Sequence, residues 1–185
     1  LGGLRKITSS IYEFSFPKPT GFKFRAGQYL EWMVPHKKSD SRGTRRYFTI
    51  VSAPEDAELR LAFKLPEKAS SYKNAMINLK AGDVVIGSQR SGDFLLPKKV
   101  DEKLGFIAGG IGVTPFVSHV TSIDAKNERR DIATLYCVAT AADMAYSEKL
   151  ASAGVLVPVV GNGEVPEGGE SGFLSADIIT RRVPD

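Results

Sequence analysis

The feature that most constrains this chain is a glycine-rich stretch at residues 106–115, with the sequence FIAGGIGVTP. Its first three residues are apolar and predict a buried strand, and the apolar residues after Pro115 recur at helical spacing. Thr114 is expected to cap that helix, with Pro115 at its first position. A strand that passes through glycines into a helix start exposes free N–H groups, as phosphate sites of α/β proteins do. The alternative is a turn without a ligand, because Pro115 stands where the G-x-G-x-x-G motif has its third glycine.

The composition is that of a globular protein. The chain has 185 residues, 42% of them hydrophobic and 25% charged, enough for one large domain or two small ones. A net charge of +4 is compatible with phosphate ligands or an acidic redox partner and gives no reason to expect nucleic acid. The single Cys137 excludes an internal disulfide and fits a cytoplasmic location. No apolar run has the length of a membrane span. Both ends are abrupt, so we expect a piece of a longer protein, in one alternative a membrane-associated redox protein with this part on the cytoplasmic face.

Residues 1–98 contain short alternating segments separated by turn residues, which is typical of a small antiparallel barrel or sandwich. The expected strands are Ile7–Phe14, Gln28–Val34, Tyr47–Ser52, Leu59–Leu65 and Val84–Ser88. One helix is expected between the last two strands, because Tyr72, Ala75, Met76 and Leu79 follow the i, i+3, i+4, i+7 rule.

From Leu104 onward strands and helices alternate, which predicts a parallel sheet with right-handed crossovers. The expected strands are Leu104–Ala108, Ile132–Val138 and Val155–Val160, and the expected helices are Thr114–Ile123, Asp143–Ala151 and Ser175–Arg181. The change of pattern near Pro97 divides the chain into residues 1–98 and 99–185.

A second informative stretch is the predicted strand that begins with Arg45 and Arg46. Side chains alternate along a strand, so Arg46 and Phe48 are expected on one face and Tyr47 and Thr49 on the other. A guanidinium group suits a phosphate, and an aromatic ring offers a flat surface to a planar ligand. An exposed edge strand with solvated arginines is the alternative.

Residues Arg46-Tyr47-Phe48-Thr49 resemble the Arg-x-Tyr/Phe-Ser/Thr flavin motif of the ferredoxin–NADP reductase superfamily. The glycine-rich stretch resembles the nicotinamide-nucleotide motif of the same family, and Gly27-Gln28-Tyr29 and Gly92-Asp93-Phe94 also match in order. The resemblance covers nearly the whole chain. It implies a six-stranded antiparallel Greek-key β-barrel for the flavin, followed by an α/β parallel-sheet domain for NAD(P). Because relatives continue to a Cys-Gly-Pro strand, we expect the second domain to lack its last strand and helix.

The resemblance also implies roles for single residues. Arg46 would pair with the flavin pyrophosphate, Phe48 would lie against the isoalloxazine ring, and Thr49 would contact N5, which accepts hydride. The helix start at residues 69–71 would hold the pyrophosphate, which favours FAD over FMN. The full set of implied cofactor-binding residues is Arg46, Tyr47, Phe48, Thr49, Ile50, Lys64, Ala69, Ser70, Ser71, Gly109, Gly110, Gly112, Thr114 and Thr140, with Thr49, Phe48 and Thr114 at the reacting centre.

Other polar residues receive plainer interpretations. Residues 139–143 contain no arginine for a 2′-phosphate and include Asp143, which favours NADH over NADPH unless Asp143 only starts a helix. His36 and His119 are interpreted as incidental, Cys137 as a buried core thiol, and no metal site is expected. The charged loop 36–45 is interpreted as a solvated connection, with a docking surface or a clasp over FAD as the alternative.

The resemblance therefore implies an FAD-dependent NAD(P)H:acceptor oxidoreductase. Hydride would pass from NAD(P)H to FAD, and electrons would go on to a protein or quinone-type acceptor. Two alternatives remain: a flavin-binding relay or regulatory module without its own NAD(P)H turnover, and a nucleotide-binding interaction domain without flavin.

Overall fold

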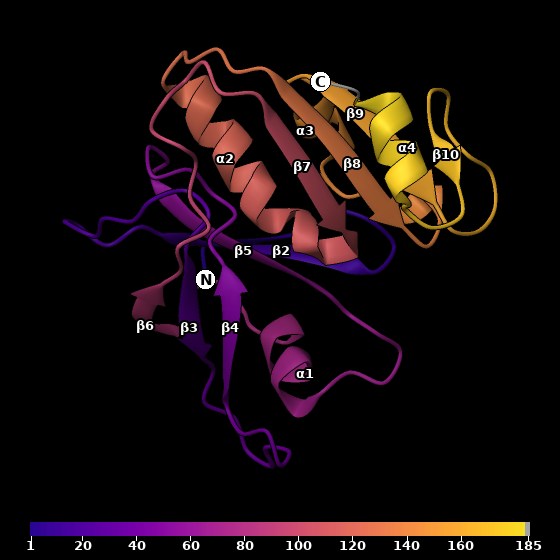
Figure 1. The fold of residues 1–185 in the computed structure, drawn as a ribbon. Helices are drawn as coiled ribbons and strands as arrows, with labels where there is room; N and C mark the ends of the chain where they lie inside the picture. The colour runs from indigo at the N-terminus through magenta and orange to yellow at the C-terminus, as the bar shows by residue number, and fades with distance from the viewer. Residues whose placement is uncertain (184–185) are drawn as a thin grey trace.

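The computed structural model describes residues 1–183 and contains three β-sheets (Figure 1). Two three-stranded antiparallel sheets, in the orders β1-β2-β5 and β4-β3-β6, come from the N-terminal half. Their strands are β1 (Gly3–Lys6), β2 (Ile11–Pro17), β3 (Tyr29–Met33), β4 (Arg45–Thr49), β5 (Glu58–Lys64) and β6 (Ile86–Ser91). Six strands are present, but their hydrogen bonding places them in two sheets, so a six-stranded barrel is not confirmed.

The five strands expected in this half are found, with shifted ends. The strand expected at residues 7–14 is two strands, because a turn intervenes in which the Thr8 Oγ1 accepts the Ile11 N–H at 3.1 Å. The strand expected at residues 84–88 begins at Ile86 and continues to Ser91. Its pairing with β3 is irregular between Tyr29 and Glu31, and this irregularity shifts its register.

The helix predicted in this half is α1 (Ser71–Ile77), which Ser70 caps by accepting the Lys73 N–H. Its buried face carries Tyr72 and Met76, which pack with Phe14, Leu61 and other side chains of both antiparallel sheets. Burial of this apolar face holds the short helix in place, since an isolated helix of this length is unstable in water.

The C-terminal half is built on a parallel sheet with strand order β10-β9-β8-β7. Its elements are β7 (Leu104–Gly109), a 3-10 turn η1 (Gly110–Val113), α2 (Thr114–Ala125), β8 (Ile132–Val138), a second 3-10 turn η2 (Ala141–Asp143), α3 (Ser147–Ala151), β9 (Val155–Val160), β10 (Glu170–Ser171) and α4 (Ala176–Arg182). The core places α2 and α3 on one face of the sheet, since Phe116, Val117 and Leu150 share a cluster with Phe106 and Tyr136. α4 packs on the other face through Ile178, against Leu135 and Val157.

Two local predictions in this half are wrong. Thr114 is not an N-cap, because the chain enters the 3-10 turn η1 first and Thr114 is already helical when α2 begins. The helix expected at residues 143–151 is a 3-10 turn ending at Asp143 and a short α3 from Ser147, separated by Tyr146 with a φ of +60°. A left-handed residue interrupts a helix, so the two pieces cannot form one.

The two halves share a core along their seam. Val51 and Ala62 of the N-terminal half pack in one cluster with Val113 and Phe116. None of the helices among residues 1–183 is both long enough and apolar enough to cross a bilayer.

Candidate functional site

The glycine-rich stretch forms an open turn at the carboxyl end of β7. A Cβ atom added at Gly109, Gly110 or Gly112 would meet no heavy atom within 4 Å, so the backbone is free to be approached by a ligand. Gly110 has a φ of +48°, which favours glycine, and its carbonyl accepts a hydrogen bond from the Tyr136 hydroxyl at 3.1 Å. Thr114 is buried at the start of α2, with 6% of its surface exposed.

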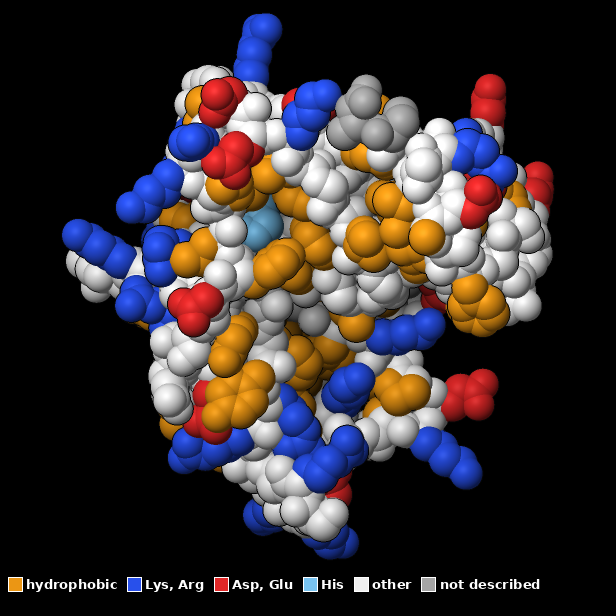
Figure 2. Space-filling model, in the orientation of Figure 1, with side chains coloured by type: hydrophobic (Ala, Val, Ile, Leu, Met, Phe, Trp, Pro, Cys, Tyr) orange, Lys and Arg blue, Asp and Glu red, His pale blue; other side chains and the backbone are white. Residues whose placement is uncertain are grey.

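The exposed face of β4 carries an aromatic surface. Tyr47 is 59% exposed and meets the ring of Tyr29 edge to face, with centroids 5.7 Å apart. Together with Thr49 these rings line an open cavity of about 360 Å³. Figure 2 shows hydrophobic side chains gathered in the hollow between the part with α2 and the part with β4, with Lys and Arg on the lower rim. A planar ring would fit against this surface.

The opposite face of β4 points into the protein, as the alternation predicts. Phe48 packs against the rings of Phe63 and Tyr72 at 5.7 and 5.9 Å, and the Arg46 guanidinium lies 5.2 Å from the Tyr72 ring. The role expected of Phe48 stays a prediction. Ile50 follows β4 and is fully buried, and its backbone N–H donates to the Gln28 carbonyl at 2.9 Å.

The groups expected to bind the pyrophosphate hold a carboxylate of the chain itself. Asp40 Oδ1 accepts from Arg46 at 3.3 Å, and Asp40 Oδ2 accepts from the Ser71 backbone N–H at 3.1 Å. Partial burial pushes the pKa of Asp40 upward, but hydrogen bonds from the Arg42 and Ser71 backbones outweigh it and keep the pKa below its usual range. Arg46 and Ser71 are thus brought together around one anion.

The same corner ties the 36–45 loop to α1. The Ser71 hydroxyl oxygen accepts the Asp40 backbone N–H at 2.9 Å and lies 3.1 Å from His36 Nε2. His36 Nδ1 lies 2.8 Å from the Val34 carbonyl, which can only accept. Nδ1 therefore carries the proton. Ala69 lies just before the cap, where its carbonyl accepts from Asn74 at 3.4 Å. The loop is anchored at this corner, in contrast to the solvated connection that we expected.

Lys64 and Thr140, two residues expected at the cofactors, meet across the seam through a third. Asp143 accepts from the Lys64 Nζ at 3.0 Å and from the Thr140 hydroxyl at 3.1 Å. The Lys64 hydrogen bond is the largest cause that lowers the pKa of Asp143, so the carboxylate is charged at neutral pH. Asp143 thus lies in a 3-10 turn and bridges the halves, a position that its place in the sequence did not indicate.

The flavin motif and the nucleotide turn are coupled through the segments that follow them. The buried Ser118 hydroxyl of α2 donates to the Ser52 carbonyl at 2.8 Å. Ser52 follows Thr49 by three residues, and Ser118 follows Thr114 by four. Because Val51 and Val113 also share the seam core, the two motifs are held in one rigid neighbourhood.

Sequence reasoning missed Tyr29, Asp40 and Asp143 as site residues. Tyr29 pairs directly with Thr49 in the β3–β4 ladder, which places its ring on the exposed aromatic face. The signal for Tyr29 was its place in the Gly27-Gln28-Tyr29 match. No local pattern marks the two carboxylates, because their partners lie 31 and 79 residues away.

The remaining candidates have limited chemistry. Cys137 is half-buried, in contrast to the buried thiol expected, and burial raises its pKa, which disfavours the thiolate. Among residues 1–183 there is no group of three His, Cys, Asp or Glu side chains that could hold a metal ion.

Comparison with known proteins gives a consistent set of relatives. Residues 106–161 match the family model described as an oxidoreductase NAD-binding domain. The chain is 27% identical over 179 residues to NADH oxidoreductase HCR of Escherichia coli, covering 96% of this chain and 53% of the relative. It is 25% identical over 171 residues to flavodoxin/ferredoxin–NADP reductase of Rhodobacter capsulatus, covering 89% and 60%.

A solved structure shows the same fold. The Amycolatopsis cytochrome P450 reductase GcoB superposes with a TM-score of 0.80 at 24% identity, covering all of this chain and 56% of that one. This chain spans no more than 60% of the length of these curated relatives. The nucleotide-binding match, the full-length alignments to reductases and the shared fold together show that the chain belongs to the ferredoxin–NADP reductase superfamily of flavoprotein oxidoreductases.

Proposed function

We propose that this chain is a reductase unit that binds FAD and a nicotinamide nucleotide, passes hydride from NAD(P)H to FAD, and delivers electrons to a protein or quinone-type acceptor. We assign FAD to residues 1–98 and the nucleotide to residues 99–185, of which 184 and 185 lie outside the described residues. The observation that carries this proposal is the coupling of the two motifs by the Ser118–Ser52 hydrogen bond and the core that Val51 and Val113 share.

The flavin side of the proposal rests on two neighbouring features of β4. Tyr29 and Tyr47 present rings at the open cavity beside Thr49, where a planar ring system would bind. Arg46 and Ser71 already hold an anion, the Asp40 carboxylate, which shows donors suited to a pyrophosphate. An aromatic platform next to an anion-binding corner is what a flavin dinucleotide requires.

The nucleotide side rests on the open glycine turn. Gly110 and Gly112 leave the backbone accessible, and the following α2 is 12 residues long, so its first N–H groups and its dipole favour a phosphate. We favour NADH, because residues 139–143 contain no arginine and Asp143 is held in its charged form. A carboxylate at that edge repels a 2′-phosphate more than a ribose hydroxyl.

The contribution of the protein to this reaction is positioning. Bound FAD supplies the chemistry, since it accepts a hydride and can release electrons singly or in pairs. The chain orients the ring with Thr49 and the tyrosines, holds the phosphates with Arg46, and keeps the nucleotide turn at a set distance through the seam. Alignment of this kind contributes several kcal/mol, up to about 7–11 kcal/mol in the best intramolecular cases.

The acceptor is the least specified part of the proposal. The P450 reductase GcoB is a structural relative, which supports a redox protein as partner. The net charge of +4 favours a partner with an acidic surface.

Anaerobic reduction tests the proposal. Protein reconstituted with FAD is mixed with NADH or NADPH in a stopped-flow instrument, and the flavin absorbance is followed. Loss of the absorbance, faster with NADH, is the expected result. Retention of FAD without reduction would support the relay alternative, and failure to retain FAD at all would support the interaction-domain alternative.

A further inference from the structure

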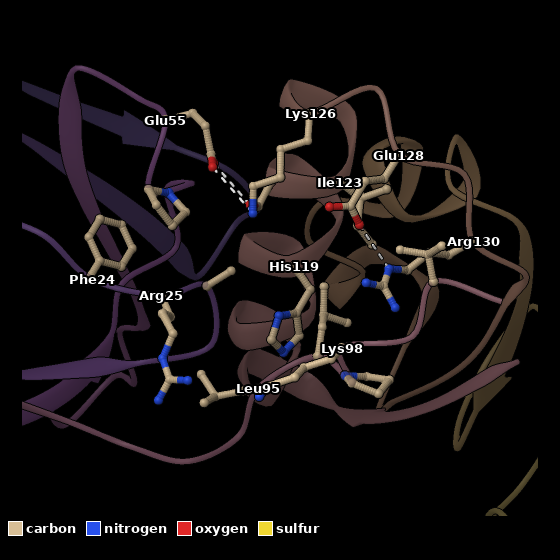
Figure 3. Close-up of a pocket in the computed structure, with 16 residues that line it drawn as sticks. Phe24, Arg25, Glu55, Leu95, Lys98, His119, Ile123, Lys126, Glu128 and Arg130 are labelled. Carbon is tan, nitrogen blue, oxygen red and sulfur yellow. Dashed lines mark hydrogen bonds and ion pairs between the residues drawn. The ribbon is translucent and has the colours of Figure 1, made fainter. Parts of the chain in front are cut away.

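A second cavity, of about 410 Å³, lies at the seam of the two halves. Its walls come from residues 24–26 and 54–55, from the connecting segment 95–100, and from α2 and the loop after it (Figure 3). None of the residues assigned above to FAD or to the nicotinamide nucleotide lines it. The volume lies within the range of small-molecule sites in proteins.

His119 forms the inner wall of this cavity and has an unsatisfied atom. The side chain is 2% exposed, lies between the rings of Phe94 and Phe106, and its Nδ1 has no hydrogen-bond partner. Burial lowers the pKa of His119 to about 4, although a backbone hydrogen bond with Phe94 opposes that shift. The ring is neutral at pH 7, and because the Phe94 carbonyl can only accept, the proton lies on Nε2 and Nδ1 is a free acceptor.

The cavity also carries uncompensated positive charge. Glu55 pairs with Lys126 at 3.5 Å, and Glu128 pairs with Arg130 at 3.1 Å, so these four charges neutralise one another. Arg25 and Lys98 also line the cavity, and neither forms an ion pair within residues 1–183. Figure 3 shows both side chains near His119, away from the two ion pairs.

The rest of the lining is largely apolar and includes Phe24, Leu95, Leu96, Val100 and Ile123. We propose that this cavity binds an organic acid with an apolar body and one hydroxyl or amine donor. The carboxylate faces Arg25 and Lys98, the apolar body packs on Leu95 and Ile123, and the donor satisfies His119 Nδ1. Such a ligand would supply the partner that this buried acceptor lacks.

The imidazole NMR spectrum gives a direct test, since the chain has only two histidines. FAD-saturated protein labelled with ¹⁵N at histidine is titrated with 4-hydroxybenzoate, and the signals of His119 and His36 are followed. We expect saturable shifts of the His119 signals and none of the His36 signals, because His36 does not line the cavity. The flavin absorbance, recorded in parallel, should stay unchanged.

Two comparisons separate the proposed contacts. Benzoate lacks the hydroxyl and should bind about fivefold more weakly than 4-hydroxybenzoate. The double variant Arg25→Gln/Lys98→Gln should weaken binding of both acids about tenfold or more. The matched control is Lys37→Gln/Lys38→Gln, which removes the same charge from a loop outside the cavity and should leave both affinities unchanged.

Three results would overturn the proposal. They are the absence of any His119 shift at millimolar 4-hydroxybenzoate, equal shifts of both histidines, and a change in flavin absorbance without a His119 shift. Equal affinities of wild type and the Arg25/Lys98 double variant would equally contradict it. None of these readouts depends on NAD(P)H turnover, so the proposed function can fail while this proposal stands.

Discussion

At the scale of single residues, the ion pair between Arg46 and Asp40 controls the corner where we propose that the pyrophosphate binds. The carboxylate accepts from the same guanidinium and the same Ser71 N–H that a phosphate would use. Two anions cannot share these donors without repulsion, so FAD must displace Asp40 or bind against its charge. Arg46 and Asp40 should therefore act on FAD affinity in opposite directions.

We predict that Arg46→Ala weakens FAD binding by about 1.5–3 kcal/mol, the usual loss for a charge-assisted hydrogen bond, and that Asp40→Asn tightens it severalfold. Dissociation constants from the quenching of FAD fluorescence measure both effects. The controls are Arg129→Ala and Glu67→Gln, which remove exposed charges that form no ion pair within residues 1–183. Weaker binding in both Arg46→Ala and Asp40→Asn would mean that Asp40 only orients Arg46.

At the scale of elements, the loop before β3 must pass close to α2 and the 92–97 segment. Gly27 has a φ of +89°, and a Cβ atom there would lie 1.9 Å from the Phe94 carbonyl oxygen and 2.6 Å from His119 Cε1. Backbone conformation and space both require glycine at this position. This requirement gives a physical reason for the glycine in the Gly27-Gln28-Tyr29 match.

We predict that Gly27→Ala lowers the free energy of unfolding by more than about 3 kcal/mol, because the methyl group would force backbone apart. Gly43→Ala is the matched control, since Gly43 also has a positive φ, +69°, but has no heavy atom within 4 Å of an added Cβ. It should cost about 1 kcal/mol. Urea unfolding of both variants measures the difference, and equal losses would contradict the proposed clash.

The packing of α2 has a pH-dependent consequence through His119. The pKa of His119 is about 4 in the folded protein and near 6.5 in the unfolded chain, so between these values only the unfolded chain binds the proton. Stability should therefore fall as the pH is lowered from 6.5 to 4, by roughly 3 kcal/mol in total, and should not change for this reason above pH 6.5. His119→Gln should reduce this loss in urea unfolding at pH 7 and pH 4.5. His36→Gln, the control, should retain it.

At the scale of the whole molecule, the seam between the halves is held by buried polar contacts as well as by the shared core. Tyr146 donates from its hydroxyl to the buried Glu13 at 2.9 Å, Lys64 pairs with Asp143, and Ser118 bonds to Ser52. Of these, the Ser118 hydrogen bond is fully buried and lies nearest the two motifs. Directional contacts of this kind favour one arrangement of the halves over others.

We predict that Ser118→Ala costs about 1–3 kcal/mol of stability, since it leaves the Ser52 carbonyl buried without that partner, and that it slows flavin reduction by NADH more than it weakens FAD binding. Ser152→Ala is the control, because Ser152 also donates to a backbone carbonyl, but in an exposed position. Urea unfolding and stopped-flow reduction measure the two effects. Unchanged reduction with lowered stability would limit Ser118 to a structural role.

Local elements could be predicted where their own residues determine them. The strands β8 and β9 match the predicted ranges, because each is a buried apolar run of the parallel-sheet type. β1 was missed, because Gly3–Lys6 is short, half polar and stabilised only by its pairing with β2. The start of α2 was displaced for a similar reason, since a 3-10 turn through Gly110 has no distinct sequence pattern.

The sequence by itself determined the class of fold, the order of the elements and the two motifs, because hydrophobic period and turn chemistry are local properties of a chain. Only the tertiary structure decided that Asp40 meets Arg46, that Asp143 joins Lys64 to Thr140, and that Tyr29 lies beside Thr49. These contacts follow from the register of strands and the docking of two halves. A side chain carries no local signal of the distant partner it will meet, so that information exists only once the chain has folded.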